Sequence, residues 1–163
     1  VLLLEAGKTT HPYSRMPVSF GLFIDKPGVN WRYRSEPEEG TANRAIPVPR
    51  GKMLGGSSAI NGLVYVRGQT LDYDTWGQLG NRSWSWEKVS KVFRRMENFD
   101  GGDDEVRGRN GPLGISEVPD QNPLYDALIS SAQSAGYPHN SDYNGLDQEG
   151  IGETQATIKR AEG

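Results

Sequence analysis

The chain has 163 residues, a formal net charge of −3 and no cysteine. This length allows a domain with a hydrophobic core, and the acidic balance disfavours a nucleic-acid-binding surface, which is normally basic. No apolar run approaches the roughly 18 residues of a transmembrane helix. The lack of cysteine excludes disulfides, thiolate metal sites and cysteine nucleophiles, and it favours a reducing, cytoplasmic compartment.

The first seven residues, VLLLEAG, read as the end of a buried strand followed by a turn. Val1 to Leu4 form a continuous apolar run, which is typical of a central parallel strand covered on both faces. Glu5 then stands at the strand end, where dinucleotide-binding folds place an acid that binds the adenosine ribose; the alternative is a surface acid. Because no initiator methionine precedes this strand, we expect a segment of a longer protein, so an N-terminal targeting signal cannot be judged.

The next part of the chain, residues 7–50, has little periodicity and is rich in proline. A stretch of this length without regular structure is uncommon inside a compact domain, so it either has a function or lacks its surroundings. Short extended pieces are expected at residues 31–34 and 45–48. Short helices are expected at residues 57–65 and 72–79.

The second half of the chain contains clearer helix signals. Ser85 is a candidate N-cap for a helix over residues 86–99. Asn122 and Pro123 begin another helix, and Gly136 ends it. The apolar positions of this last helix predict a buried stripe: Leu124, Leu128, Ala132 and Ala135. Residues 101–111 read as a surface loop, and residues 112–118 and 151–159 as strands.

A block of glycine and serine at residues 50–74, RGKMLGGSSAINGLVYVRGQTLDYD, carries the most specific information. Gly55 and Gly56 allow the backbone to approach another molecule closely and to adopt dihedrals closed to other residues. Ser57 and Ser58 follow them with two hydroxyls and a candidate helix start, where free N–H groups favour anions. The block therefore predicts a segment that lies against a phosphate-bearing ligand; the alternative is a tight turn with a helix cap.

The same block resembles the first signature of the glucose–methanol–choline (GMC) oxidoreductases, which are FAD-dependent enzymes that mostly oxidise alcohols. The likeness runs without a gap over residues 51–74, through GKMLGGSSAIN to Tyr65, Gly68 and Asp74. A segment similar to LLLEAG also occurs in the family, and the chain resembles its choline dehydrogenase branch. The chain departs from the pattern in lacking the phosphate-binding loop GxGxxG.

The resemblance implies an α/β fold that combines part of a Rossmann-like FAD-binding domain, residues 1–110, with the start of a sheet-based substrate domain, residues 111–163. Residues 53–64 would wrap the FAD, with the last four of these beside the isoalloxazine ring. The residues implied to bind the cofactor are Glu5, Met53, Gly55, Gly56, Ser57, Asn61, Gly62, Leu63 and Val64. Some family members carry a histidine at the position of Ile60, joined covalently to the flavin, so isoleucine there predicts noncovalent FAD.

The implied reaction transfers a hydride from an alcohol carbon to flavin N5, with a small-molecule alcohol as substrate and oxygen or a quinone as electron acceptor. The family's catalytic histidine lies far toward the C-terminus, so no catalytic residue is assigned to this chain, which we expect to be inactive alone. One alternative is a hydroxynitrile lyase of the same fold. Another is a noncatalytic or incomplete flavin-binding fragment.

The remaining polar residues are interpreted as structural. His11 and His139 lie in proline-containing polar loops without a carboxylate partner, which indicates a surface role. The acidic stretch that begins at Asp142 fails the spacing of a calcium loop and reads as a polar turn, so no metal site is predicted. A mixed, solvated surface is expected from residues Arg94, Arg95, Arg107, Arg109, Glu97, Asp103, Asp104 and Glu105. Packing of nearby helices is expected from Trp76, Trp84 and Trp86.

Overall fold

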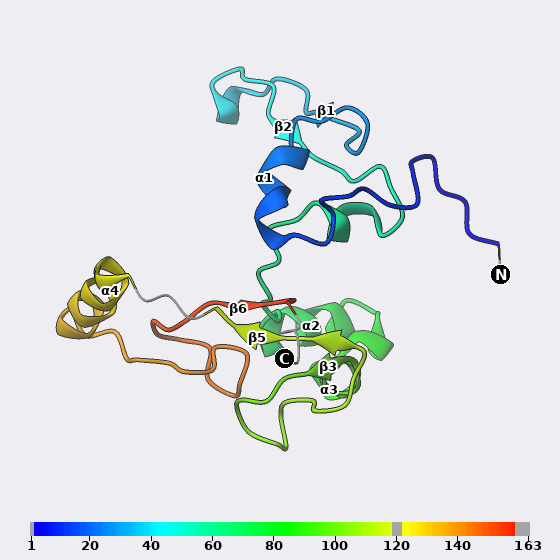
Figure 1. Cartoon of the computed structure of the whole chain (residues 1–163). Helices are drawn as coiled ribbons and strands as arrows, with labels where there is room; N and C mark the ends of the chain where they lie inside the picture. The colour runs from blue at the N-terminus through cyan, green and yellow to red at the C-terminus, as the bar shows by residue number, and fades with distance from the viewer. Residues whose placement is uncertain (1, 119–121, 159–163) are drawn as a thin grey trace. The chain divides into compact units, whose positions relative to one another are not determined.

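The computed structural model describes residues 2–118 and 122–158, and the chain divides into two compact units, residues 1–63 and residues 64–163. Short helices and two-stranded sheets make up both units, which is consistent with a mixed α/β chain (Figure 1). This division differs from the expected functional boundary after residue 110, which stays a prediction. In the described parts of the chain, no helix is both long and apolar enough to cross a bilayer.

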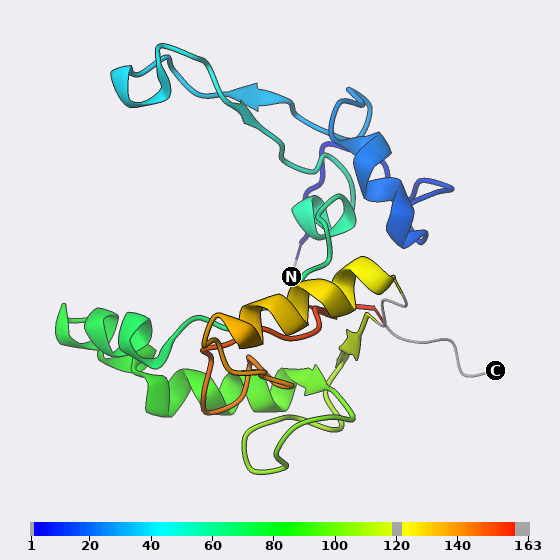
Figure 2. The same cartoon turned by 90° about the vertical axis from the view of Figure 1, so that its left-hand side faces the viewer.

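The first unit is built mainly of turns around a small core. Its elements are the 3-10 helix η1 (Pro17–Ser19), helix α1 (Phe20–Phe23), strand β1 (Tyr33–Arg34), η2 (Glu39–Thr41), strand β2 (Pro47–Val48) and η3 (Gly56–Ala59). Strands β1 and β2 pair antiparallel, with Tyr33 opposite Val48, and the long connection between them is the cyan loop of Figure 2. Both strands lie inside the extended pieces that the sequence predicts.

The predicted N-terminal strand is not formed in the described residues. Leu2, Leu3 and Leu4 are exposed and have no strand partner, and Val1 lies outside the described residues. The first backbone pairing is an isolated parallel bridge between Lys8 and Met53. An apolar run becomes a central strand only where neighbouring strands and covering helices bury it, and the first unit supplies neither to these leucines.

The helices of the second unit begin close to where the sequence places them. Helix α2 (Thr70–Gln78) begins with a capping box between Gln69 and Asp72. Helix α3 (Trp86–Met96) follows η4 (Arg82–Trp84) and has Ser85 at its N-cap position, although the Ser85 side chain makes no capping bond. Helix α3 ends at Met96 rather than residue 99 because the chain enters strand β3 (Glu97–Asn98).

Tryptophans hold α2, η4 and α3 together, as the sequence predicts. The rings of Trp76 and Trp84 lie 5.7 Å apart, edge to face, and Tyr73 lies 5.7 Å from Trp86. Edge-to-face and tilted arrangements of this kind are the favoured geometry of aromatic pairs. The cluster holds α2, which begins at the end of the glycine-serine block, against α3.

The sheets of the second unit are short. Strand β3 pairs parallel with β4 (Leu113–Gly114), and β5 (Ser116–Glu117) pairs antiparallel with β6 (Gln155–Ala156). The predicted strand at residues 112–118 is therefore two strands with different partners, and the one at 151–159 is shorter than predicted, with residue 159 outside the described residues. The core of this unit contains Tyr65, Phe99 and Ile115.

Helix α4 (Pro123–Ser134) has the predicted ends but not the predicted burial (Figure 1). Asn122 Oδ1 accepts a bond of 3.0 Å from the Leu124 N–H, and Gly136 adopts φ +95° after the last turn. The expected buried stripe is wrong, since Leu124 and Leu128 are 77% and 57% exposed. Helical spacing shows which residues share a face, but not what covers that face. The helix instead contacts its unit through Tyr125, whose hydroxyl donates to the Gly152 carbonyl (3.0 Å).

Candidate functional site

Residues 51–60 of the glycine-serine block form a loop, called the glycine-serine loop below, that is closed by direct contact between backbone segments. A Cβ atom added to Gly51 would lie 2.0 Å from the Gly56 carbonyl oxygen, and one added to Gly7 would lie 1.9 Å from the Lys52 carbonyl oxygen. The Leu54 N–H donates to the Lys8 carbonyl at 3.0 Å. The segment that follows Glu5 is thus packed against the glycine-serine loop, so the structure brings together two parts of the predicted site.

Glycine dihedrals and serine hydroxyls shape the tip of this loop. Gly55 and Gly56 have φ angles of +94° and +56°, a region that favours glycine. The Ser57 hydroxyl accepts a bond from the Gly51 N–H (3.2 Å), and the Ser58 hydroxyl donates to the Gly55 carbonyl (2.7 Å). Both serines therefore stabilise the loop from within.

The predicted helix at residues 57–65 is wrong beyond its first turn, because η3 ends at Ala59. Asn61 Oδ1 accepts a bond of 3.0 Å from the Leu63 N–H, and Leu63 adopts φ +65°. This local turn competes with helical hydrogen bonds, and a positive φ is strained for a leucine. The chain leaves η3 through a non-helical turn at the residues expected beside the flavin ring, and this turn is exposed except for the half-buried Leu63.

Two residues of the loop point into the protein rather than toward a ligand. Met53 and Ile60 are buried with Phe23 and Val29 in the core of the first unit. Met53 can therefore meet a cofactor only through its backbone, and the Ile60 side chain is committed to packing. This core holds both ends of the glycine-serine loop in place.

The residues predicted to contact the ligand are otherwise accessible. Ser57, Asn61 and Gly62 are exposed, and a Cβ atom added to Gly56 or Gly62 would meet no atom within 4 Å. Val64, the first residue of the second unit, is exposed and forms an isolated bridge with Ala156. Open space over glycine backbone fits a planar ligand in close approach, so the loop fits the flavin that the resemblance implies.

Glu5 is exposed at the turn that leads into the loop. Its Oε1 atom accepts a hydrogen bond of 2.7 Å from the Gly7 N–H. The carboxylate is thereby held next to the segment that packs on the glycine-serine loop. Its role as a ribose ligand stays a prediction.

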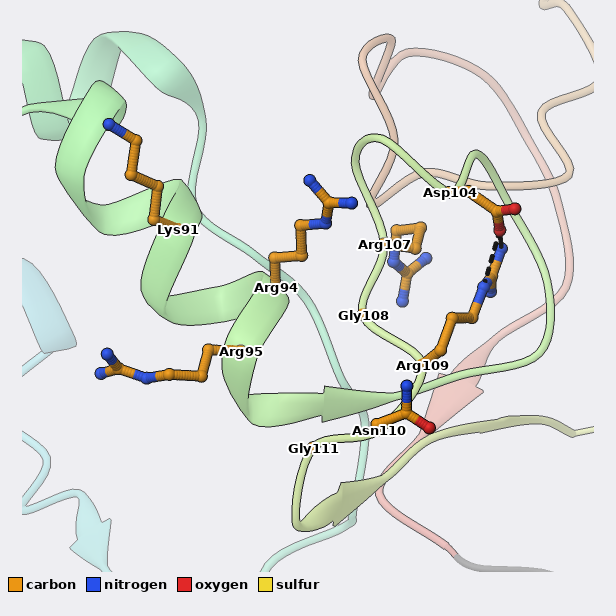
Figure 3. Close-up of a pocket in the computed structure, with 9 residues that line it drawn as sticks. All are labelled: Lys91, Arg94, Arg95, Asp104, Arg107, Gly108, Arg109, Asn110 and Gly111. Atoms are coloured by element: carbon orange, nitrogen blue, oxygen red, sulfur yellow. Dashed lines mark hydrogen bonds and ion pairs between the residues drawn. The ribbon is translucent and has the colours of Figure 1, made fainter.

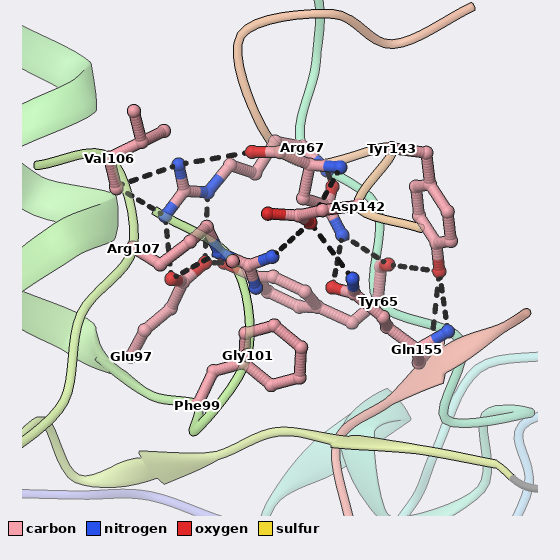
Figure 4. Close-up of polar contacts among 12 residues, drawn as sticks. Tyr65, Arg67, Glu97, Phe99, Gly101, Val106, Arg107, Asp142, Tyr143 and Gln155 are labelled. Atoms are coloured by element: carbon pink, nitrogen blue, oxygen red, sulfur yellow. Dashed lines mark hydrogen bonds and ion pairs between the residues drawn. The ribbon is translucent and has the colours of Figure 1, made fainter. Parts of the chain in front are cut away.

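A buried network of charged side chains lies in the second unit, and no sequence pattern predicted it (Figure 4). Glu97 accepts bonds from Arg67 Nε (2.8 Å), from Arg107 Nε (3.0 Å) and from the Tyr65 hydroxyl (2.6 Å). Arg107 also pairs with Asp142 and lies over the Phe99 ring, 4.2 Å from its centroid. The expectation of a solvated surface is therefore wrong for Glu97 and Arg107, which are fully buried.

The network controls the ionisation of its members. Burial of Glu97 alone would favour its neutral form, but hydrogen bonds from Tyr65, Arg107 and Arg67 reverse this and lower the pKa of the Glu97 carboxyl. Burial, together with the hydrogen bond to Glu97, raises the pKa of the Tyr65 hydroxyl to about 12. Glu97 is thus held as a carboxylate and Tyr65 as a neutral hydrogen-bond donor.

Asp142 is an anchor of this network. Its Oδ1 atom accepts bonds from Arg107 and from Gln155 Nε2 (2.9 Å). Within the described residues, no group of three or more histidine, aspartate or glutamate side chains is arranged to hold a metal ion. The Gly145 N–H donates to the Asp142 carbonyl at 2.8 Å, so the predicted turn does begin at Asp142, while the lack of a metal site stays a prediction.

An open cavity of about 570 Å³ lies between α3 and the loop over residues 101–111 (Figure 3). Arg94 points toward this loop, whereas Arg95 points away from it. Arg94 and Arg95 are exposed, and Arg109 pairs with the exposed Asp104. These residues form the mixed, solvated surface that the sequence predicts. The cavity is lined by Lys91, Arg94, Arg95, Asp104, Arg107, Gly108, Arg109, Asn110 and Gly111.

Neither histidine has the surroundings of a catalytic base. His11 Nε2 lies 2.8 Å from Lys26 Nζ, and its ring packs edge to face on Phe23. Desolvation and the charges of Lys26 and Lys8 lower the pKa of His11. His139 is exposed, and neither side chain has a carboxylate partner among the described contacts. The expected surface position is observed for His139, whereas His11 is half-buried against Phe23.

Comparison with known proteins gives one consistent result. A family model described as GMC oxidoreductase matches residues 6–162. The chain is 44% identical over 161 residues to an oxygen-dependent choline dehydrogenase of Sinorhizobium fredii. It is 42% identical over 163 residues to an oxygen-dependent choline dehydrogenase of Photobacterium profundum. Each match covers 98% of this chain and 29% of the relative. The crystal structure of pyridoxine 4-oxidase from Mesorbium loti matches with a TM-score of 0.83 and 33% identity, over 95% of this chain and 31% of that one. The chain thus spans less than a third of the length of these relatives.

Proposed function

This chain belongs to the GMC oxidoreductase family, and from that membership we propose that it forms the flavin-contacting part of an FAD-dependent enzyme that oxidises the CH–OH group of a small alcohol. The observation that carries the proposal is the closed glycine-serine loop followed by a turn in which Asn61 and Gly62 are exposed and Leu63 is half-buried. This turn presents open backbone where a planar ring could approach.

Residues of the first unit, together with Val64, would hold different parts of the FAD. Gly55, Gly56 and Ser57 would bring backbone close to the cofactor, and Glu5 would bind the adenosine ribose. Asn61 to Val64 would lie beside the isoalloxazine ring. Met53 and Ile60 would contribute indirectly, because their buried side chains fix the loop that carries these contacts.

When bound, the flavin supplies the chemistry by accepting a hydride from the alcohol carbon. The chain's own part is to place the ring: the strained backbone of Leu63 and the bond from its N–H to Asn61 keep the turn in one shape. The exposed Val64 would offer an apolar surface beside the ring. The base that takes the hydroxyl proton is expected outside this chain.

The substrate and electron acceptor are proposed from the relatives. Two of them are named oxygen-dependent choline dehydrogenase and one pyridoxine 4-oxidase. Choline is therefore the first alcohol to test, and molecular oxygen the first acceptor. A quinone is the second acceptor to test.

The test uses the purified full-length protein that contains this chain. We expect a flavin absorption band at neutral pH, bleaching of that band by choline under anaerobic conditions, and its return when oxygen is admitted. Because Ile60 stands where a linking histidine would be, acid precipitation should release the flavin into the supernatant. A full-length protein without a flavin band would contradict the proposal, and a band that remains with the precipitate would contradict noncovalent binding.

A further inference from the structure

We propose that Asn144 is a positioning residue for the flavin-contacting segment, because its side chain holds the backbone of residues 65–67, which directly follows Val64. This inference rests on the proposed function, since it concerns the placement of Val64 beside the flavin. The contacts that carry it all lie within the second unit.

The Asn144 amide bonds to the backbone of two residues at once. Its Oδ1 atom accepts a bond of 2.6 Å from the Arg67 N–H, and its Nδ2 atom donates 3.1 Å to the Tyr65 carbonyl. A neighbouring strand would offer the same acceptor and donor to residues i+2 and i of an extended segment. The side chain therefore takes the place of a strand on this edge of residues 65–67.

Strand β6 holds the same segment through other backbone groups. The Tyr65 N–H donates to the Gln155 carbonyl at 2.8 Å, and Val64 forms its bridge with Ala156. The Tyr143 hydroxyl adds a bond of 3.0 Å to the Tyr65 carbonyl. Residues 64–67 are thus fixed by partners far away in the sequence rather than by local structure.

Asn144 is itself locked by the charged network. It is 1% exposed, its N–H donates to Asp142 Oδ1 at 3.3 Å, and its Nδ2 atom also donates to Gln155 Oε1 at 2.9 Å. Asp142 pairs with Arg107, which bonds to Glu97. A rigid chain of contacts therefore runs from the buried ion pairs to the backbone next to Val64, as precise placement of a functional group requires.

The experiment replaces Asn144 with alanine in the flavin-loaded full-length enzyme. The matched control is Asn140→Ala. Asn140 ties the same loop through its Nδ2 bonds to the carbonyls of Asp147 and Glu149 and through its Oδ1 atom, which accepts from the Asp142 N–H at 2.8 Å, but it has no described contact with residues 65–67. A second variant, Tyr143→Phe, removes the hydroxyl bond to Tyr65 with little change in volume. It keeps the test decisive if Asn144→Ala does not fold.

We expect Asn144→Ala and Tyr143→Phe to shift the visible flavin band and to slow anaerobic flavin reduction at saturating alcohol at least tenfold, with KM changed less than twofold. Asn140→Ala should keep the parent's band and rate even where its melting temperature falls. A merely structural role would lower the melting temperature without moving the flavin band. The inference would be overturned if Asn144→Ala and Tyr143→Phe keep the flavin band and reduction rate of the parent. It would also be overturned if Asn140→Ala shows the same changes in band and rate as these two variants.

Amide hydrogen exchange separates this inference from the proposed function. The N–H groups of Tyr65 and Arg67 should exchange faster in Asn144→Ala than in Asn140→Ala. Unchanged exchange would overturn the positioning role even in an enzyme that binds flavin and oxidises alcohol. If exchange is faster in Asn144→Ala but the parent full-length protein carries no flavin, the backbone role of Asn144 stands and the proposed function is contradicted.

Discussion

Arg67 holds Glu97 at two points: Arg67 Nε lies 2.8 Å from Glu97 Oε1, and Arg67 Nη2 lies 2.6 Å from Oε2. Their side chains are 1% and 0% exposed. Two-point guanidinium–carboxylate pairs are among the strong, directional hydrogen-bonded contacts of proteins. Because water cannot solvate either charge, each depends on the other for its stability in the interior.

Arg67→Met should therefore be strongly destabilising. It leaves the Glu97 charge with fewer partners, and breaking a buried pair typically costs about 3–5 kcal/mol. The control is Lys91→Met, because the Lys91–Glu87 pair is 72% and 76% exposed and such pairs contribute roughly 0–1 kcal/mol. Denaturant unfolding of the full-length protein measures both, and equal losses would contradict the buried pair's importance.

Alkaline pH should weaken the fold through Tyr65. Its folded pKa of about 12 lies above the ordinary value of 10.0, so the stabilisation is fully present below pH 10 and is lost as the pH rises toward 12. At about 1.4 kcal/mol for each pH unit, the loss is on the order of 3 kcal/mol. Unfolding free energies from pH 9 to 12 should fall more for the parent than for Tyr65→Phe. Parallel curves would contradict the prediction.

Gly51→Ala should damage the glycine-serine loop. The new Cβ atom would lie 2.0 Å from the Gly56 carbonyl oxygen, and a backbone atom cannot move aside cheaply. Overpacking of this kind costs roughly 1–3 kcal/mol, and we expect the full-length enzyme to retain less flavin. Gly28→Ala is the control, since a Cβ atom there meets nothing within 4 Å. Flavin content per protein and melting temperature measure the difference; a Gly51→Ala variant with the parent's flavin content would count against the loop's role.

Asn122→Ala should lower stability by about 1 kcal/mol through loss of the helix cap. The Asn122 Oδ1 atom accepts from the Leu124 N–H at 3.0 Å, and alanine offers no acceptor. Ser130→Ala, on the exposed surface of α4, should stay within roughly 0.5 kcal/mol of the parent. Helicity and thermal unfolding of the full-length variants provide the comparison. A loss at Ser130 as large as that at Asn122 would contradict the cap.

Features encoded by neighbouring residues could be predicted from the sequence. The ends of α4 followed from Asn122 and Gly136, and the turn at Gly55 and Gly56 followed from the glycine pair itself. These signals act within a few residues, where dihedral preference and capping bonds decide the structure. The tight backbone turn of the glycine-serine loop could be predicted for the same reason, and its role in binding FAD stays a proposal.

Burial could not be predicted, because it depends on contacts between distant residues. Leu128 has the spacing of a buried position but is exposed, and Arg107 lies in a polar stretch but is fully buried. The Arg67 N–H meets Asn144 across 77 residues of sequence, and no local pattern marks that pair. The positioning part of the site therefore appeared only in the structure.

The buried charges also restrict how this protein can evolve or be redesigned. Arg67 and Arg107 carry two positive charges, and Glu97 and Asp142 carry two negative charges, so the network is neutral as a whole. Replacing one member leaves a whole charge unbalanced in the interior, whereas a well-packed apolar replacement of a complete pair is often neutral or stabilising. Substitution at these positions should therefore proceed in pairs, and mutant libraries that vary one position at a time would miss the apolar replacements of a complete pair.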